Sequence, residues 1–166
     1  AGKLGLNEGM LFENSDEPLA KELARAIMSA KRKKQPIETT SQLREIVEQV
    51  VLRTKPENPK EAVKKTCQRV FQALRIDVNS EFEVLDSFLE ALPHILKPGG
   101  KAAILTFHSG EDRMVKKSFQ YYAREGIYSD IAKDVIRPSA KECASNPRAR
   151  STKFRWAVRS DVQKYE

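Results

Sequence analysis

Residues 97–113 read KPGGKAAILTFHSGEDR, and this stretch decides the fold. A Pro-Gly-Gly stop is followed by an apolar strand, 102–107, and by a polar elbow, 108–113, that opens a helix. A short apolar run without polar alternation is typical of a central parallel strand that is covered on both faces. Ser109 and Asp112 have the spacing of a helix cap. Polar groups just past such a strand lie where ligands bind in open α/β sheets, but these residues also fit a plain capped turn.

The composition favours a folded protein that does not enter a membrane. The 166 residues are enough for one domain with a core, or for one domain and a lobe. No apolar run approaches the length of a membrane helix, and the first residues lack the features of a signal peptide, so we expect no membrane partner and no secretion. The first residue is Ala rather than Met, which is consistent with a fragment or a processed form.

Charge and cysteine usage narrow the function classes. The net charge of +7 and the pI near 9.4 favour a polyanionic partner, although a basic surface also serves solubility. The two cysteines, Cys67 and Cys143, lie far apart without a CxxC partner. They predict reduced thiols and neither a disulfide framework nor a zinc site.

The chain before residue 97 has the pattern of successive helices. Residues 1–15 are weakly patterned and predict a lead-in or linker. Apolar residues at helical spacing then predict four helices. Thr39 with Gln42 forms a capping box at the second of them, and Pro93 inside the last should kink or restart it. The expected helices cover approximately residues 16–32, 39–53, 60–76 and 80–96.

After residue 100 the pattern changes to β-α-β-β. The strand 102–107 and a helix over 111–124 form one unit, and a short extended piece is predicted at 134–137. Alternation in TKFRWAVR, residues 152–159, predicts the clearest strand of the chain. So few strands cannot bury both faces of 102–107. We therefore expect the second half of a doubly wound sheet whose first strands lie elsewhere, with the earlier helices as a separate lobe.

Several kinds of site are disfavoured. His108, Ser109 and Asp112 do not predict a hydrolase triad, because the Ser is not in a G-x-S-x-G elbow and adjacent side chains do not readily face each other. The only other histidine is His94, and no ligand spacing predicts a metal. No P-loop or G-x-G-x-x-G fingerprint follows a strand, so the chain alone predicts no nucleotide site.

The C-terminal part of the chain favours nucleic acid as the partner. Five cations cluster in the irregular loop 144–150 and on one predicted face of the strand 152–159, with Trp156 on the other face. Such a surface can neutralise phosphates and stack on unpaired bases. A sheet edge protected by charge would show the same pattern. The five cations are Arg148, Arg150, Lys153, Arg155 and Arg159.

Three separated motifs resemble one family. The segments 69–81, RVFQALRIDVNSE, then 97–113, and then 146–151, NPRARS, resemble in this order the MraW/RsmH type of S-adenosylmethionine-dependent methyltransferase. The resemblance spans roughly 19–159, and residues 36–40 are similar to the family's helical insertion. Two departures are visible. Gly110 stands where a Leu is usual, which should loosen the elbow, and residues 67–70 replace a run that usually ends in Arg-Thr.

The resemblance implies a fold and an activity. It implies an α/β fold, namely the C-terminal half of a doubly wound, Rossmann-like class I methyltransferase sheet preceded by an all-helical inserted lobe. The implied domains are a lead-in at 1–15, the lobe at 16–66 and the C-terminal part of the methyltransferase domain at 67–166. The implied reaction is N4-methylation of a cytidine in small-subunit ribosomal RNA, with S-adenosylmethionine as the cofactor and the small ribosomal subunit as the partner. Bacterial cytoplasm and the interior of a mitochondrion or plastid all fit this family.

The family's Gly-rich loop, acidic ribose-binding residue and Asp-Leu-Gly-type loop are not in this sequence. We therefore assign no cofactor-binding residue here and expect another segment or chain to supply the N-terminal half, so that this chain alone is inactive. Catalytic residues stay unassigned, and Glu111 and Asp112 also fit a helix cap, as Asn146 fits a turn. The elbow candidates are His108, Ser109, Glu111, Asp112 and Arg113, and the predicted RNA-binding residues are Asn146, Arg148, Arg150, Lys153 and Arg155.

Three hypotheses for the function remain open. The chain is the C-terminal part of an active rRNA methyltransferase whose N-terminal half is deleted, disordered or on another chain. Alternatively, it is a non-catalytic RNA-binding or ribosome-assembly module derived from that family. The third hypothesis is an unrelated α/β interaction domain.

Overall fold

The structure, a computed structural model, describes residues 8–161 except residues 34 and 36. Expectations for residues 1–7 and 162–166, and for the first residue of the segment 36–40, lie outside the described residues. The chain divides into two compact units, Ala1–Glu81 and Phe82–Glu166. Within the described ranges, no helix combines the length and the apolar character that crossing a membrane requires.

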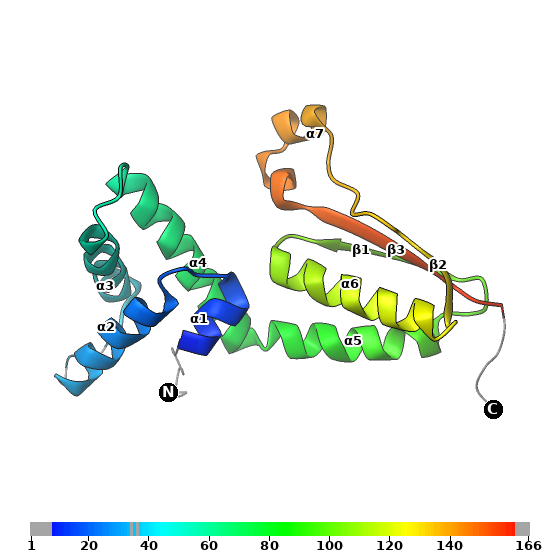
Figure 1. The fold of residues 1–166 in the computed structure, drawn as a ribbon, viewed down its shortest axis with the longest axis horizontal. Helices are drawn as coiled ribbons and strands as arrows, with labels where there is room; N and C mark the ends of the chain where they lie inside the picture. The colour runs from blue at the N-terminus through cyan, green and yellow to red at the C-terminus, as the bar shows by residue number, and fades with distance from the viewer. Residues whose placement is uncertain (1–7, 34, 36, 162–166) are drawn as a thin grey trace. The chain divides into compact units, whose positions relative to one another are not determined.

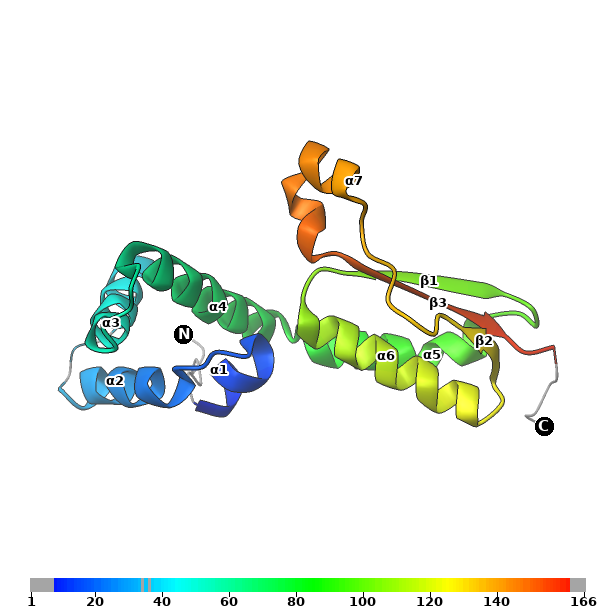
Figure 2. The same ribbon diagram turned by 45° about the horizontal axis from the view of Figure 1, so that its top comes forward.

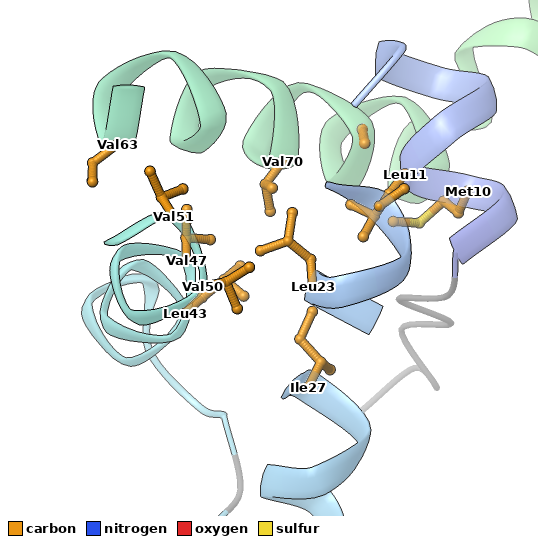
Figure 3. Close-up of a cluster of buried hydrophobic side chains, with 12 residues drawn as sticks. Met10, Leu11, Leu23, Ile27, Leu43, Val47, Val50, Val51, Val63 and Val70 are labelled. Atoms are coloured by element: carbon orange, nitrogen blue, oxygen red, sulfur yellow. The ribbon is translucent and has the colours of Figure 1, made fainter. Parts of the chain in front are cut away.

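The first unit is built from helices, whose apolar faces meet in one core. Helix α1 packs on α2 and α4, and α3 packs on the same two helices. Leu11, Leu23, Val47 and Val70, one from each helix, are completely buried at the centre (Figure 3). The helices are α1 (Glu8–Ser15), α2 (Ala20–Arg32), α3 (Thr40–Arg53) and α4 (Pro59–Asn79).

Local sequence signals set the ends of α3 and α4. The capping box predicted at Thr39 is confirmed: its hydroxyl accepts from the Gln42 backbone N–H at 3.2 Å, and the Gln42 side chain accepts from the Thr39 N–H at 3.0 Å. The Asn58 side chain caps α4, which starts at a proline. Ser80 ends α4 in the left-handed conformation, with φ of 51°.

The start of the first unit differs from the expectation. Residues 8–15 form α1 in place of the expected lead-in, and the helix expected over 16–32 begins only at Ala20. Asp16 has φ of 50°, a left-handed conformation that interrupts the helical path after Ser15. The apolar pattern of α1 is weak because its main buried apolar residues are Met10 and Leu11, and so few residues give little periodicity.

A buried ion pair holds the turn between α1 and α2 against α4. Glu17 is completely buried, and its Oε2 accepts from Arg69 Nε at 2.6 Å. Its other oxygen accepts from the Leu19 N–H at 2.9 Å, and Arg69 also donates to Thr66. The carboxylate is therefore fully occupied by donors, as a buried charge requires.

The second unit combines helices with a small antiparallel sheet. The strand order is β1-β3-β2, and both pairs are antiparallel. Helices α5 and α6 lie on one face of this sheet (Figures 1 and 2), where Leu89, Leu92 and Val115 pack on Ala102 and Ala157. The elements are α5 (Glu81–Ile95), β1 (Lys101–Thr106), α6 (Ser109–Arg124), β2 (Tyr128–Ile131), α7 (Ala140–Ser145), the 3₁₀ helix η1 (Pro147–Ser151) and β3 (Lys153–Arg159).

The strand expected at 102–107 is present as β1, and a parallel neighbour and a second covering layer are not found among the described residues. It pairs antiparallel with β3, and no parallel pair occurs among the described strands. Only one of its faces is covered, because Ala102 and Thr106 are buried whereas Leu105 is 57% exposed. The structure thus contains a mixed α/β unit with a small antiparallel sheet.

Three further expectations can be set beside the structure. The extended piece at 134–137 forms an isolated bridge from Ile136 to Phe154 instead of a strand, and the strand β2 precedes it. Of the kink or restart expected at Pro93, the restart does not occur, because α5 continues through Pro93 to Ile95. The two compact units divide after Glu81, next to the left-handed turn at Ser80, whereas residues 66 and 67, where a domain boundary was expected, lie within α4.

Candidate nucleic-acid interface

The elbow after β1 is held by a reciprocal cap that uses a histidine. His108 is the N-cap of α6, and its Nδ1 accepts from the Glu111 N–H at 3.4 Å. The Glu111 carboxylate reaches back and accepts from the Phe107 N–H at 3.0 Å. The cap expected at Ser109 and Asp112 therefore lies one residue earlier. A histidine in this position provides a ring nitrogen where Ser or Asp would provide an oxygen.

Glu111 is a carboxylate of the elbow that contacts the His108 ring. His108 Nε2 lies 3.3 Å from Glu111 Oε1, close enough for attraction although the orientation falls short of an aligned hydrogen bond. The His108 side chain holds the pKa of the Glu111 carboxyl below its ordinary value; partial burial opposes this shift, and the Phe107 N–H reinforces it. Because His108 and Glu111 hold one another, both are engaged in the turn.

Asp112, the second carboxylate of the elbow, reaches β3. It accepts two hydrogen bonds from Arg155, from Nε to Oδ1 at 2.7 Å and from Nη2 to Oδ2 at 3.2 Å. Lys153 Nζ lies 3.9 Å from the same Oδ2. The side chains of Arg155 and Asp112 are only 9% and 13% exposed, so this is a largely buried ion pair.

The basic face predicted for the terminal strand is turned inward, which corrects the expectation of an exposed surface. Lys153, Arg155, Ala157 and Arg159 point toward the helices, where Arg155 and Ala157 are buried. Arg159 donates from Nε to the Pro93 carbonyl and from Nη1 to the Ile127 carbonyl, both at 3.0 Å. These arginines can lie between the sheet and the helices because a carboxylate or backbone carbonyl groups accept their hydrogen bonds there.

Three of the predicted RNA-binding residues, Asn146, Arg148 and Arg150, are exposed on a projecting segment. Asn146 caps η1 by accepting from the Arg148 N–H at 3.2 Å, and Ala149 is buried as an anchor. Neither arginine has an ion-pair partner among the residues that the structure describes. We call the segment 146–151 the basic loop.

The elbow and the basic loop lie at the same end of the sheet. The elbow follows β1 and the basic loop precedes β3, and the antiparallel register sets Thr106 opposite Lys153. Figures 1 and 2 show α7 and η1 projecting beyond this end, where α6 begins. The exposed elbow residues Ser109 and Arg113 lie in the first turns of α6. This end therefore brings together exposed cations and the exposed Phe107, the side-chain types that bind phosphates and stack on bases.

Gly110 is accommodated by a residue that the sequence did not single out. A Cβ atom placed on Gly110 would lie 2.7 Å from Cζ of Phe82 and 3.3 Å from the His108 ring. The Phe82 ring also packs on His108, with the two centroids 5.8 Å apart. Phe82 thus fills the space beside Gly110. This contact offsets the loss of the apolar Leu side chain that is usual at position 110. The sequence signal for Phe82 was only its place in the apolar stripe of α5.

The fold defines a mixed α/β protein with a small antiparallel sheet, and sequence comparison shows the family to which it belongs. The chain belongs to the MraW methylase family, because the sequence profile of that family matches residues 6–160. It is 61% identical to "Ribosomal RNA small subunit methyltransferase H 1" of Lachnoclostridium phytofermentans and 63% identical to the protein of the same name from Agathobacter rectalis. These matches cover 92% of this chain but 42% and 44% of the relatives.

A more distant relative gives the same picture. The chain is 56% identical to "Ribosomal RNA small subunit methyltransferase H 2" of Alkaliphilus metalliredigens, over 92% of this chain and 44% of that protein. The chain thus spans less than half the length of these curated relatives.

Changing Glu111 to Gln should destabilise the second unit at pH 7 by about 1 kcal/mol, the usual effect of losing a helix cap. Because the folded pKa of Glu111 is lowered, its contribution is full above the ordinary value of 4.5 and is lost as the pH falls through the folded pKa. The stability difference from the unchanged chain should therefore shrink below about pH 4.5. Urea unfolding between pH 3 and 7, followed by circular dichroism, measures it. Glu90→Gln, on the exposed side of α5, is the control, and a pH-independent difference for Glu111→Gln would contradict this assignment.

Gly110 and Phe82 should be coupled in a double-mutant cycle. Gly110→Ala alone gains helix propensity but forces the Phe82 ring to move. In a Phe82→Ala background the same change should be more favourable by about 0.5–1 kcal/mol, since the obstacle is gone and the propensity gain remains. Urea unfolding of the four proteins gives the coupling free energy. Additive effects would show that the ring and the glycine do not constrain each other.

Proposed function

We propose that this chain is the C-terminal part of an S-adenosylmethionine-dependent methyltransferase that modifies the N4 amine of a cytidine in small-subunit ribosomal RNA. The carrying observation is the family match over residues 6–160, together with relatives that are named as small-subunit rRNA methyltransferases. The exposed basic loop beside the elbow supports an RNA-facing role for this part.

The exposed side of the sheet supports the proposal that the chain is one half of a doubly wound domain. On the face away from α5 and α6, Leu105 and Phe107 are 57% and 59% exposed, and Phe154 and Trp156 are partly open. The outer edge of β1 has no partner strand among the described residues. Apolar edges of this kind are normally covered, because they otherwise pair with other chains. We infer that the rest of the domain adds strands beside β1 and covers this face.

The same geometry supports the helical lobe as an insertion. Helix α5 precedes β1 and packs on the sheet as the crossover helix of a β-α-β unit would. In such a unit a strand precedes the crossover helix. In this chain the four helices of the first unit precede α5. We propose that these helices interrupt the crossover between such a strand and α5.

The residues present do not form a cradle for S-adenosylmethionine. The loop after β1 carries two carboxylates, the kind of group that binds a ribose hydroxyl, but Glu111 is engaged with His108 and Asp112 with Arg155. The sequence has no Gly-rich loop after a strand. The proposed donor site therefore belongs to the remainder of the protein, and no step of the reaction is assigned to the donor here.

The proposed reaction places modest demands on this chain. An exocyclic amine that attacks a sulfonium methyl group needs orientation and removal of water more than an activated nucleophile. The target base must leave its stack while the phosphates around it are held. Arg148 and Arg150 can hold phosphates, and Phe107 offers an aromatic face. Asn146 shapes the basic loop by capping η1.

A chimera tests the proposed function. In the Lachnoclostridium phytofermentans relative, this chain replaces the matched segment of 154 residues. With labelled S-adenosylmethionine and small ribosomal subunits that lack the modification, the chimera should transfer methyl groups, as the intact relative does, whereas this chain alone should not. If the chain alone bound S-adenosylmethionine or transferred methyl groups, the donor site would lie in this chain and not in the remainder of the protein. An inactive but folded chimera would overturn the enzyme proposal, and RNA binding by the chain would then favour the non-catalytic module.

The phosphate role of the basic loop has its own test. Arg148→Ala with Arg150→Ala should weaken binding to small-subunit rRNA and reduce the slope of log K against log salt by about 0.7 for each lost single-strand phosphate contact. Lys116→Ala with Lys117→Ala removes the same charge from exposed positions of α6 and is the matched control. Fluorescence anisotropy over a salt series measures both. Equal slopes for the two double variants would contradict the assignment.

A further inference from the structure

The Asp112–Arg155 pair joins two segments that the proposed function uses. Asp112 lies within the elbow, in the first turn of α6, and Arg155 lies near the start of β3, shortly after the basic loop. The two residues are 43 positions apart in the chain. Their fork of two hydrogen bonds, at 2.7 and 3.2 Å, fixes both the separation and the mutual orientation of these segments.

The cations of this cluster are not free to bind phosphate. Arg155 spends two N–H groups on Asp112 in a largely buried site, and Lys153, 16% exposed, lies 3.9 Å from the same carboxylate. If either cation turned outward to a phosphate, Asp112 would remain buried with less compensation. This cost separates them from Arg148 and Arg150, which are exposed.

The pair adds a side-chain link at the end of the strand pairing. Lys153 pairs with Thr106 at the last step of the β1–β3 ladder, where the Thr106 hydroxyl donates to the Lys153 carbonyl at 3.4 Å. On the other side of β3, Phe154 forms an isolated bridge with Ile136. Beyond these contacts the chain leaves the sheet as the basic loop. The fork at Arg155 is a charged, two-bond side-chain link between the start of β3 and the elbow.

We propose that Asp112 and Arg155 are positioning residues for RNA: they hold the basic loop and the elbow in one arrangement, so that phosphates and an unpaired base are bound together. This inference rests on the proposed function. It also reassigns Arg155 and Lys153 from phosphate ligands to partners of Asp112, and Asp112 from a candidate catalytic carboxylate to a structural anion.

The substitution Asp112→Asn distinguishes phosphate binding by Arg155 and Lys153 from positioning of the loop, because the two roles predict opposite changes in RNA affinity. If Arg155 and Lys153 bound phosphate, removing the competing negative charge would tighten RNA binding and steepen its salt dependence. If Asp112 positions the loop, the same change should weaken binding, although the protein becomes more positive. Arg155→Lys tests the other partner, because lysine keeps the charge but cannot form the fork.

The experiment measures binding of the chain to labelled small-subunit rRNA across a salt series. We expect Asp112→Asn and Arg155→Lys each to weaken binding about fivefold at every salt concentration, with the slope unchanged. Circular dichroism at the assay temperature confirms that each variant is folded. Glu17→Gln, which removes the partner of Arg69 in the first unit, controls for loss of a buried ion pair as such, and it should leave RNA affinity unchanged.

Each outcome bears on the proposal. Tighter binding by Asp112→Asn, or wild-type binding by Arg155→Lys, overturns it. A weakening by Glu17→Gln equal to that of Asp112→Asn also overturns it, since any loss of stability would then suffice. If the unchanged chain does not bind RNA, the proposed RNA-facing role fails first and the inference fails with it. If Arg148→Ala with Arg150→Ala lowers the salt slope while Asp112→Asn tightens binding, only the positioning role fails.

Discussion

The burial of Arg155 against Asp112 is the interaction on which the second unit depends. The guanidinium of Arg155 lies under a helix because a carboxylate meets it there, and the first turn of α6 supplies that carboxylate from Asp112. The pair fixes which face of β3 is the inner one. With Arg155 inside, Ala157 and Arg159 follow by alternation, while Phe154 and Trp156 must lie on the open face. The face of the sheet that the helices cover is therefore the face that carries Arg155 and Ala157.

This arrangement leaves apolar side chains exposed on the face of the sheet opposite the helices. The helices that could cover apolar side chains lie on the face that carries the cations, whereas Leu105 is exposed and the aromatic residues of β3 are only partly buried. Exposed surface of this kind costs solubility unless something is bound to it. Each of the two compact units nevertheless has its own core.

The sequence predicted the helices well, but it did not predict the sheet's orientation. Apolar stripes locate α3 and α4, and the capping box at Thr39 is present as predicted, because both signals arise from contacts within one helix. Alternation in β3 defines two faces, but it cannot say which is inside when the charged face has a buried partner 43 residues away. Likewise β2 was missed because only its first residue, Tyr128, is buried. At the elbow the residues were predicted as a group, but a histidine cap lies outside the usual Ser, Thr, Asp and Asn signal.

The elbow illustrates why clustered polar residues are weak evidence for catalysis. His108, Ser109, Glu111 and Asp112 have the composition of an active site, yet one carboxylate is held by a histidine and a backbone N–H and the other by an arginine. A general base needs a pKa near neutrality and access to the substrate, whereas the pKa of Glu111 is lowered. Methyl transfer to an exocyclic amine depends on alignment more than on an activated nucleophile. In this elbow the two carboxylates therefore have structural partners, Glu111 in the helix cap and Asp112 in the ion pair with Arg155.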